Sequence, residues 1–267
     1  MMHNLKLPSH IPLASSYDPI TFAKIRVDGF NREKVPSADY DCPKCLNKER
    51  IAFLREDGTP GFLECDCKAV RRSIRAMKKS GLEAVIRDLT FDRFQATEPW
   101  QKRILSGCQA YAAEPKLWLL LCGQSGSGKT HLCSAICREL LRNGHAVQYM
   151  TWREQAGVLK RLGTDAQRDA LLEELKTAPV LYIDDLFKTG AGPDGQANPT
   201  AADVNLAFEI LNHRYHNRML TILSTEKSPG ELVNIDEATG SRILELAREN
   251  TYHIRPDRKK NFRLREQ

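Results

Sequence analysis

Eight residues near the middle of the chain, GQSGSGKT from Gly123 to Thr130, fit the pattern G-x-x-x-x-G-K-[ST] of a phosphate-binding loop. The glycines let the backbone turn tightly, so that its N–H groups face the β- and γ-phosphate oxygens of a nucleotide. Lys129 adds a positive charge there, and the Thr130 hydroxyl can bind Mg²⁺. The pattern predicts that a nucleoside triphosphate is held by the following residues: Gly123, Gln124, Ser125, Gly126, Ser127, Gly128, Lys129, Thr130 and His131.

A second stretch, VLYIDD from Val180 to Asp185, is an apolar run that ends in two carboxylates. At the C-terminal end of a strand beside a phosphate-binding loop, Asp184 is suited to hold the Mg²⁺ shell. Asp185 would then face the γ-phosphate and orient the attacking water. The alternative interpretation is that the two acids only cap the strand.

A third apolar stretch, LTILST from Leu220 to Thr225, ends in two hydroxyl residues. One hypothesis is that Thr225 senses the γ-phosphate from the end of this predicted strand. The other is that Thr225 simply caps the turn that follows.

Four of the eight cysteines are grouped as C-x2-C-x19-C-x-C: Cys42, Cys45, Cys65 and Cys67. In a cytoplasmic protein, thiols grouped in this way indicate a tetrahedral zinc site rather than disulfides. Turns at Asp57-Gly58 and Pro60-Gly61 would bring together two short strands between the cysteine pairs. Four thiolates leave no open coordination position, so zinc here would be structural. The alternative is four unrelated reduced thiols.

The elements that position these residues alternate between strands and helices. Apolar runs predict strands over residues 117–121, 145–150, 180–185 and 220–225. Helical periodicity predicts helices after the phosphate-binding loop, over 152–162 and 165–176, and from an N-cap at Thr200. The helix after Thr200 is expected to bury one apolar stripe: Val204, Phe208, Leu211 and Tyr215. This alternation predicts an α/β fold with a parallel sheet covered by helices on both faces.

Composition and charge limit the function classes. With 28% charged and 41% hydrophobic residues, the 267-residue chain has the composition of an ordinary globular protein. No apolar run approaches the ~20 residues of a membrane span, and the N-terminus lacks the apolar core of a secretory signal. We therefore expect a cytoplasmic protein without a membrane partner. The net charge of +6 suits an acidic partner such as nucleic acid.

Three parts are expected along the chain. Residues 1–40 contain four prolines and little periodicity, which is typical of a flexible arm. Residues 41–85 would form the zinc-binding module, ending in a basic helix over 68–80, and residues 86–267 would form the nucleotide-binding core. The two faces of the basic helix are Val70, Ile74 and Met77 on one side and Arg71, Arg75 and Lys78 on the other. The basic face would contact nucleic-acid phosphates or an acidic partner; alternatively, the helix is only a solvated link.

The order of motifs resembles a known family. The run GQSGSGKTHLCSAICRELLRNGHAVQYMT is similar to the bacterial DnaC/DnaI-type helicase loaders of the AAA+ superfamily. So is the order of the segments that follow: LYIDDLF, NHRYHNRMLTILSTE, GSRILELA and a basic NFRL. The likeness covers about residues 88–265, and the four-cysteine module resembles the zinc-bearing N-terminal region of DnaI-like and prophage loaders.

The resemblance implies roles for individual residues. Lys129, Thr130 and Asp184 would bind ATP·Mg²⁺, with Asp185 as the catalytic carboxylate. Thr225 falls where the family has a sensor asparagine. Arg242 falls in the motif that supplies positive charge to the ATP of a neighbouring subunit. Many family members carry a second arginine four residues later, but here that position is Leu246, so Arg248 is the alternative. The 152–162 segment matches a helix associated with single-stranded DNA, with three candidate phosphate contacts: Arg153, Lys160 and Arg161.

The resemblance also implies a function. The cysteine module would bind the replicative DNA helicase, and ATP-bound cores would self-associate and grip single-stranded DNA. Slow, partner-stimulated ATP hydrolysis would then release the loader. Two alternatives are a transposition-associated ATPase of the IstB type, which shares the core, and a small P-loop kinase, which the paired acids fit poorly.

Overall fold

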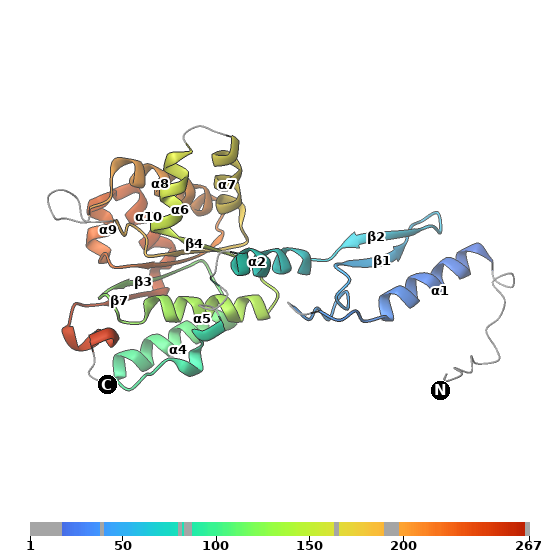
Figure 1. Ribbon diagram of the computed structural model, residues 1–267, viewed down its shortest axis with the longest axis horizontal. Helices are drawn as coiled ribbons and strands as arrows, with labels where there is room; N and C mark the ends of the chain where they lie inside the picture. The colour runs from blue at the N-terminus through green and yellow to red at the C-terminus, as the bar shows by residue number, and fades with distance from the viewer. Residues whose placement is uncertain are drawn as a thin grey trace, which may run out of the picture. The chain divides into compact units, whose positions relative to one another are not determined.

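The structure, a computed structural model, describes residues 18–37, 40–79, 82, 87–162, 166–189 and 198–264 (Figure 1). The chain divides into two compact units, Met1–Lys68 and Ala69–Gln267. None of the described helices has the length and apolar character that crossing a bilayer demands.

A five-stranded parallel sheet forms the centre of the larger unit, with the strand order β4-β5-β6-β3-β7. Its strands are β3 Trp118–Gly123, β4 Val147–Thr151, β5 Val180–Asp184, β6 Leu220–Thr225 and β7 Thr251–Ile254. Every residue of β3 and β5 is buried, as expected for strands covered on both faces. The predicted parallel α/β fold is therefore confirmed.

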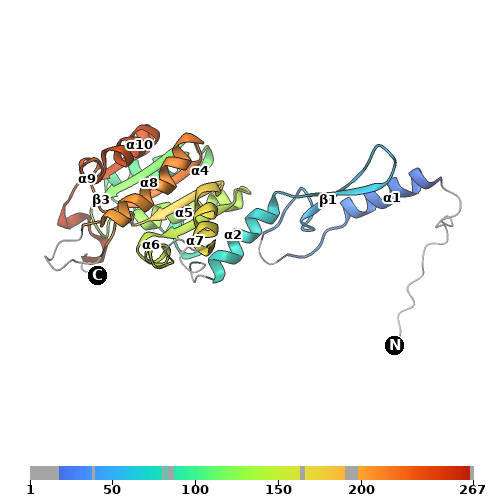
Figure 2. The same cartoon turned by 90° about the horizontal axis from the view of Figure 1, so that it is seen from above.

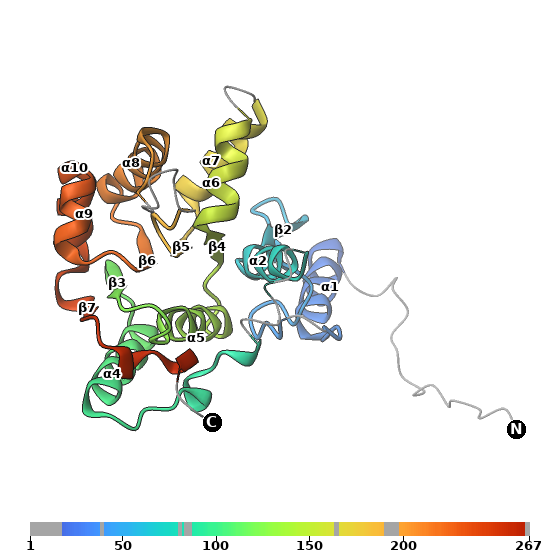
Figure 3. The ribbon, with the colours of Figure 1, turned by 60° about the vertical axis from the view of Figure 1, so that its left-hand side comes forward.

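Helices cover both faces of this sheet. They are α4 Pro99–Ala113, α5 Lys129–Arg142, α6 Trp152–Arg161, α7 Ala166–Thr177, α8 Ala201–His216, α9 Pro229–Ile235 and α10 Glu237–Ala247. Helices α4 and α5 lie on one side, and the other five lie on the opposite side (Figure 1 and Figure 3). Trp152, Leu172 and Ile210 join the strands in one apolar core, which ties three of these helices to the sheet.

The strand order brings separate loops to one edge of the sheet. Strand β6 pairs with β5 on one side and with β3 on the other, and all three run in the same direction. Their carboxyl ends therefore meet, which is where open parallel sheets bind ligands. The phosphate-binding loop after β3, the acid pair of β5 and the hydroxyl residues of β6 converge at this edge.

Helix α8 begins as predicted but buries a different face. Thr200 is its N-cap and forms a capping box with Asp203. Of the stripe predicted to be buried, only Leu211 is buried, whereas Phe208 is 37% exposed. The face turned to the core instead consists of Asp203, Leu206, Ala207, Ile210, Leu211 and Arg214.

The smaller unit contains a helix where a flexible arm was expected. Helix α1, Pro19–Arg32, begins at the N-cap Asp18 and runs alongside β1 (Figure 1 and Figure 2). The Asn31 side chain donates to Ala52 O over 2.9 Å and accepts from Ala52 N–H over 3.0 Å. Because this residue ties α1 to the hairpin, the prediction of an arm is wrong for residues 19–32; residues 1–17 lie outside the described residues.

Two antiparallel strands complete the smaller unit: β1 Arg50–Leu54 and β2 Pro60–Glu64. The predicted turn at Asp57-Gly58 joins them, and Gly58 has φ +77. Helix α2, Cys67–Lys79, begins at the last cysteine, and the compact unit ends at Lys68. Arg71 of α2 is buried, contrary to its predicted position on an exposed basic face.

Candidate functional site

The phosphate-binding loop connects β3 to α5 through a backbone that only glycine fits at two positions. Gly128, the N-cap of α5, has φ +90, and a Cβ there would lie 2.6 Å from the ring of Phe94. A Cβ on Gly126 would lie 2.0 Å from Asn261 Oδ1. The N-terminus of α5 is therefore closely enclosed and points its N–H groups into the loop, the arrangement that binds phosphates in many proteins.

Lys129 is held inside the loop. Its Nζ donates to Gly123 O over 2.9 Å and to Gln124 O over 2.8 Å. Burial lowers the pKa of this ammonium, while the negative charges of Glu226 and Asp185 act in the opposite sense. Carbonyl oxygens are weaker partners than a phosphate, so an arriving phosphate can take over this buried cation.

Asp184 is surrounded by hydroxyl groups. Thr130 Oγ1 donates to its Oδ1 over 2.9 Å, which brings together the two side chains predicted to hold Mg²⁺. Tyr182 OH and Ser224 Oγ also donate to Oδ1, and Tyr149 OH donates to Oδ2 over 2.8 Å. Burial raises the pKa of both tyrosines, so they remain protonated donors. The carboxylate is thus fixed in orientation for a cation beside Thr130.

Asp185 follows in a left-handed backbone conformation, with φ +57. Its N–H donates to Ser224 Oγ over 3.0 Å, and its Oδ2 lies 2.9 Å from Lys188 Nζ. Lys188 also pairs with Glu226 Oε1 at 3.0 Å. Burial tends to raise the pKa of Glu226, but hydrogen bonds from Ser125 and Lys188 outweigh it and hold this pKa below its ordinary value.

A cavity of about 510 Å³ is lined by the loop, by both acids of β5 and by Lys188 and Glu226. Its volume lies within the range usual for small-molecule sites. The structure therefore gathers the loop lysine, the pair predicted to bind Mg²⁺ and Asp185 around one cavity. The sequence analysis missed Lys188 and Glu226. Neither residue belongs to a motif, so the sequence does not reveal that their side chains face the cavity.

An aromatic wall closes one side of this cavity. The ring of Phe94 packs edge-on against His131 at 5.3 Å and against Phe262 at 5.8 Å. Phe262 N–H donates to Gly126 O over 2.8 Å, which fastens the C-terminal segment to the loop. His131 Nε2 lies 2.7 Å from Thr90 O, so this ring contributes to the wall. The sequence analysis noted only that the segment NFRL is basic and missed the role of its aromatic residue, Phe262.

Thr225 does not line the cavity. It is fully buried, donates to Leu186 O over 2.7 Å and accepts from Lys227 N–H over 3.1 Å. This geometry matches the alternative in which Thr225 caps the turn. Ser224, the neighbouring residue, reaches both acids instead. Alternation along β6 sends one hydroxyl to the site and the next one away from it.

Arg242 lies on α10 and does not line the cavity of its own chain. It donates to Ala238 O over 2.7 Å, and its guanidinium lies 5.4 Å from the ring centroids of Phe208 and Tyr215. Arg248 follows α10 and is exposed. A role for either arginine in the site of a neighbouring subunit stays a prediction.

The α6 segment offers fewer phosphate contacts than predicted. Arg153 and Arg161 are exposed. Lys160 Nζ, however, lies 2.6 Å from the buried carboxylate of Asp203 at the start of α8. That ion pair ties two helices together and makes Lys160 a structural residue in this conformation.

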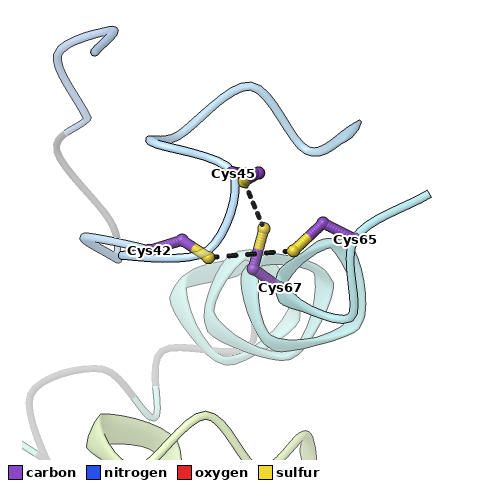
Figure 4. A group of neighbouring side chains, drawn as sticks. All are labelled: Cys42, Cys45, Cys65 and Cys67. Atoms are coloured by element: carbon purple, nitrogen blue, oxygen red, sulfur yellow. Dashed lines mark hydrogen bonds between the residues drawn. The ribbon is translucent and has the colours of Figure 1, made fainter. Parts of the chain in front are cut away.

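The four cysteines of the smaller unit meet as predicted (Figure 4). All four are buried, and their sulfur atoms lie within 4.8 Å of one another. Cys42 Sγ is 3.8 Å from Cys65 Sγ, and Cys45 Sγ is 3.4 Å from Cys67 Sγ. A tetrahedron with Zn–S bonds of ~2.3 Å has edges of about 3.8 Å, so this donor set fits zinc.

The backbone around the first cysteine pair forms a compact knuckle. Cys42 N–H donates to Asn47 Oδ1 over 2.7 Å, and the Asn47 amide donates to Val35 O over 2.8 Å. Leu46 and Asn47 have φ of 49 and 76, respectively. Burial raises the pKa of Cys65 and Cys67, so without a metal these thiols hold their protons. A zinc ion would have to displace these protons, so zinc should bind more weakly at low pH.

The family described as IstB-like ATP binding protein matches residues 63–245. The chain belongs to this family. The chain is also similar to the phage-like element PBSX protein XkdC of Bacillus subtilis (strain 168), 35% identical over 220 residues, with 78% of this chain and 79% of the relative covered. The replicative helicase loader DnaC of Escherichia coli (strain K12) is 23% identical over 208 residues, covering 75% and 80% of the two chains.

Solved structures share the fold of the family's ATP-binding core. The DnaC helicase loader superposes with a TM-score of 0.51 at 20% identity, over 64% of this chain and 97% of the other. The replication initiator DnaA bound to AMPPCP and single-stranded DNA gives a TM-score of 0.51 at 19% identity, over 65% of this chain and 51% of the other. The predicted AAA+ P-loop fold and the resemblance to DnaC-type proteins are confirmed.

Proposed function

We propose that this protein is an ATP-dependent loader of a replicative DNA helicase onto single-stranded DNA. The observation that carries the proposal is that one chain, related to replicative helicase loaders, holds an ATP·Mg²⁺-type site in one unit and a four-cysteine module in the other. Such a division suits a switch, because one unit can respond to nucleotide while the other holds a partner.

ATP hydrolysis would use the residues around the cavity. Lys129 and the loop N–H groups bind the phosphates, Thr130 and Asp184 hold Mg²⁺, and Asp185 orients the attacking water. An aspartate carboxylate sits one methylene, about 1.5 Å, further back than a glutamate would. We therefore expect basal turnover below the ~1 s⁻¹ low end of typical enzymes, and stimulation when partners order the site.

The smaller unit is the proposed helicase-binding part. It exposes apolar side chains on α1 and β2, among them Phe22 at 39%, Ile25 at 48% and Phe62 at 52%. Exposed apolar groups on a small module typically serve a protein partner. We retain the proposed division into a helicase-binding module of residues 41–85 and an ATP-binding core of residues 86–267, and we add α1 to the binding part in place of a flexible arm.

Single-stranded DNA and a second copy of the chain would bind the larger unit. Arg153 and Arg161 are the proposed phosphate contacts on α6. Arg242, with Arg248 as the alternative, would reach the ATP of an adjacent subunit when ATP-bound cores assemble.

The test is co-purification with the replicative helicase of the same cell. Wild-type protein should retain the helicase in the presence of ATP, and a Phe22→Ser/Phe62→Ser variant should lose it while still binding ATP. Retention of a transposase instead would favour the IstB-type alternative, which the family description also fits. Phosphoryl transfer from ATP to a nucleoside would favour the kinase.

A further inference from the structure

An ion-pair cluster on the cavity wall contains two residues, Lys188 and Glu226, that have no role in the predicted site. Lys188 Nζ lies 2.9 Å from Asp185 Oδ2 and 3.0 Å from Glu226 Oε1. All three residues line the cavity that Lys129 and Ser125 also line. One ammonium therefore serves two carboxylates inside a phosphate-binding cavity, and one of those carboxylates is the group proposed to orient water.

The backbone aims Lys188 at Asp185. Lys188 N–H donates to Asp185 O over 2.9 Å, which closes a tight turn directly after β5. Asp185 and Phe187 both have positive φ, 57 and 62, a conformation that costs energy for residues other than glycine. Leu186 and Phe187 are buried, and Phe187 packs against Trp152 at 5.7 Å. The turn is thus anchored in the core, and this anchoring fixes the backbone positions of Asp185 and Lys188.

We propose that Lys188 senses the terminal phosphate: it pairs with Asp185 and Glu226 when no triphosphate is bound, and moves to the γ-phosphate when one is. The proposal rests on the proposed ATPase function. An ammonium on a carboxylate oxygen occupies its lone pairs and offsets the charge that attracts a water proton. Transfer of Lys188 to the phosphate frees that oxygen, so Asp185 can orient water only when a γ-phosphate is present.

The charges in the cavity support this exchange. The Lys188 side chain is 34% exposed and has a flexible four-carbon stem, so its ammonium can move. A γ-phosphate carries more negative charge than one carboxylate and competes well for the ammonium, whereas ADP has no such group. Glu226 opposes the move because it holds the same ammonium. It therefore determines how strongly the triphosphate must compete.

The proposal is tested by a double-mutant cycle on nucleotide affinity, measured with the full chain, Mg²⁺, ADP and a non-hydrolysable ATP analogue. Glu226→Gln should tighten binding of the analogue roughly tenfold, the size of one moderate charge interaction, and binding of ADP less than about twofold. In the Lys188→Met background, Glu226→Gln should change both affinities by the same factor. Lys188→Arg, which keeps the charge, should restore the preference for the analogue.

Several outcomes would overturn the role of Lys188. If Glu226→Gln tightens the analogue equally with and without Lys188, general repulsion by Glu226 explains the effect. If Lys188→Met discriminates between the analogue and ADP as well as wild type does, no sensing occurs. Lys188→Gln removes the same charge and supports the measurement should Lys188→Met fold poorly.

Two controls separate this proposal from the proposed function. Lys116 is exposed and precedes β3, at the opposite end of that strand from the phosphate-binding loop, so Lys116→Met should leave both affinities unchanged. Lys129→Met should abolish tight binding of the analogue. If it does not, the proposed ATP site itself is wrong. If it does, and Lys188 and Glu226 show no coupling, only the role of Lys188 is overturned.

Discussion

At the scale of single residues, the orientation of Asp184 depends on hydroxyl donors from four different elements of the core. Thr130 comes from α5, Tyr149 from β4, Tyr182 from β5 itself and Ser224 from β6. Hydrogen bonds to an ionised group are the stronger kind, and a carboxylate held by several of them cannot rotate freely. Magnesium binding demands such a fixed oxygen, because the ion tolerates little distortion of its octahedral shell.

Tyr149→Phe removes one of these donors without changing the shape of the side chain. Loss of a hydrogen bond to a charged group costs ~1.5–3 kcal/mol, and here part of that cost falls on Mg²⁺ binding. We expect the Mg²⁺ concentration for half-maximal ATPase to rise several-fold, while ATP binding without Mg²⁺ is nearly unchanged. Tyr111→Phe is the matched control, because the Tyr111 hydroxyl donates to Leu117 O, outside the cavity lining.

Only some of the individual site residues could be predicted from the sequence. The loop, Asp184 and the four cysteines follow from fixed spacings, and the structure brings each set together. The sequence analysis chose Thr225 at the end of β6, but Ser224 reaches the acids, because the orientation of the strand decides which hydroxyl faces them. The position of Lys188 in the cavity depends on a left-handed backbone conformation at Asp185. No local sequence pattern predicts a positive φ at an aspartate.

At the scale of elements, a buried arginine joins the start of β6 to the end of α7. Arg214 is fully buried and donates to four backbone carbonyls and one hydroxyl: Leu175 O, Lys176 O, Ala178 O, Leu220 O and Thr221 Oγ1. Burial lowers the pKa of this guanidinium to about 10, still far above neutrality. The charge is therefore kept, and it is stabilised by oxygens that would otherwise lack partners.

Arg214→Met should destabilise the larger unit by about 3–5 kcal/mol, since it removes five hydrogen bonds from buried groups and leaves carbonyls unsatisfied. Chemical denaturation followed by the fluorescence of the buried tryptophans would measure this change. Arg142→Met, at an exposed arginine that forms a surface ion pair with Glu139, should change stability by less than about 0.5 kcal/mol. Equal effects of the two substitutions would contradict the structural role of Arg214.

A second contact between elements makes stability depend on pH. Burial tends to raise the pKa of Asp203, but hydrogen bonds from Lys160 and Thr200 lower it more, and the net pKa lies below the ordinary value. Because the folded-state pKa is depressed, this contribution is complete above the unfolded pKa of ~3.9 and is lost as the pH falls through the folded pKa. Lys160→Met should raise the Asp203 pKa and move the midpoint of acid unfolding to higher pH. Arg161→Met, on the same helix, should leave the midpoint unchanged.

Helix α8 illustrates what element-level patterns leave open. It carries two apolar stripes, and the sequence alone favoured the stripe that includes Phe208 and Tyr215. The structure buries the other stripe against the sheet and covers these two rings with the Arg242 guanidinium, at 5.4 Å from each. Which stripe faces the core is decided by packing with α6, α7 and α10, and none of these contacts is local in sequence.

At the scale of the whole molecule, the four cysteines and the phosphate-loop cavity lie in different compact units, so we expect damage to one unit to leave the other folded. Cys42→Ser/Cys45→Ser should abolish binding of one zinc per chain and unfold the smaller unit, because a small module of this kind depends on its metal. Binding of the ATP analogue by the larger unit should persist. Metal analysis and nucleotide titration on the same preparation test both statements. Absence of zinc from freshly purified wild-type protein would remove the metal assignment.

The last prediction concerns two copies of the molecule. Arg242 does not line the cavity of its own chain, so we expect any direct contact with ATP to be made in the site of a neighbouring subunit. Arg242→Ala and Asp185→Asn should each bind ATP and each lose the hydrolysis that helicase or single-stranded DNA stimulates. A mixture of the two variants contains interfaces that combine an intact Asp185 with an intact Arg242.

Such mixed interfaces should recover part of the stimulated hydrolysis, because positive charge reaching a γ-phosphate from outside stabilises its transition state. An equal mixture of random ring or filament neighbours contains both groups at about a quarter of its interfaces, which sets the recovery expected if each site acts alone. Repeating the mixture with Arg248→Ala in place of Arg242→Ala identifies the arginine that acts. Full stimulated activity of both the Arg242→Ala and the Arg248→Ala variants would mean that each subunit hydrolyses ATP without either arginine of its neighbour.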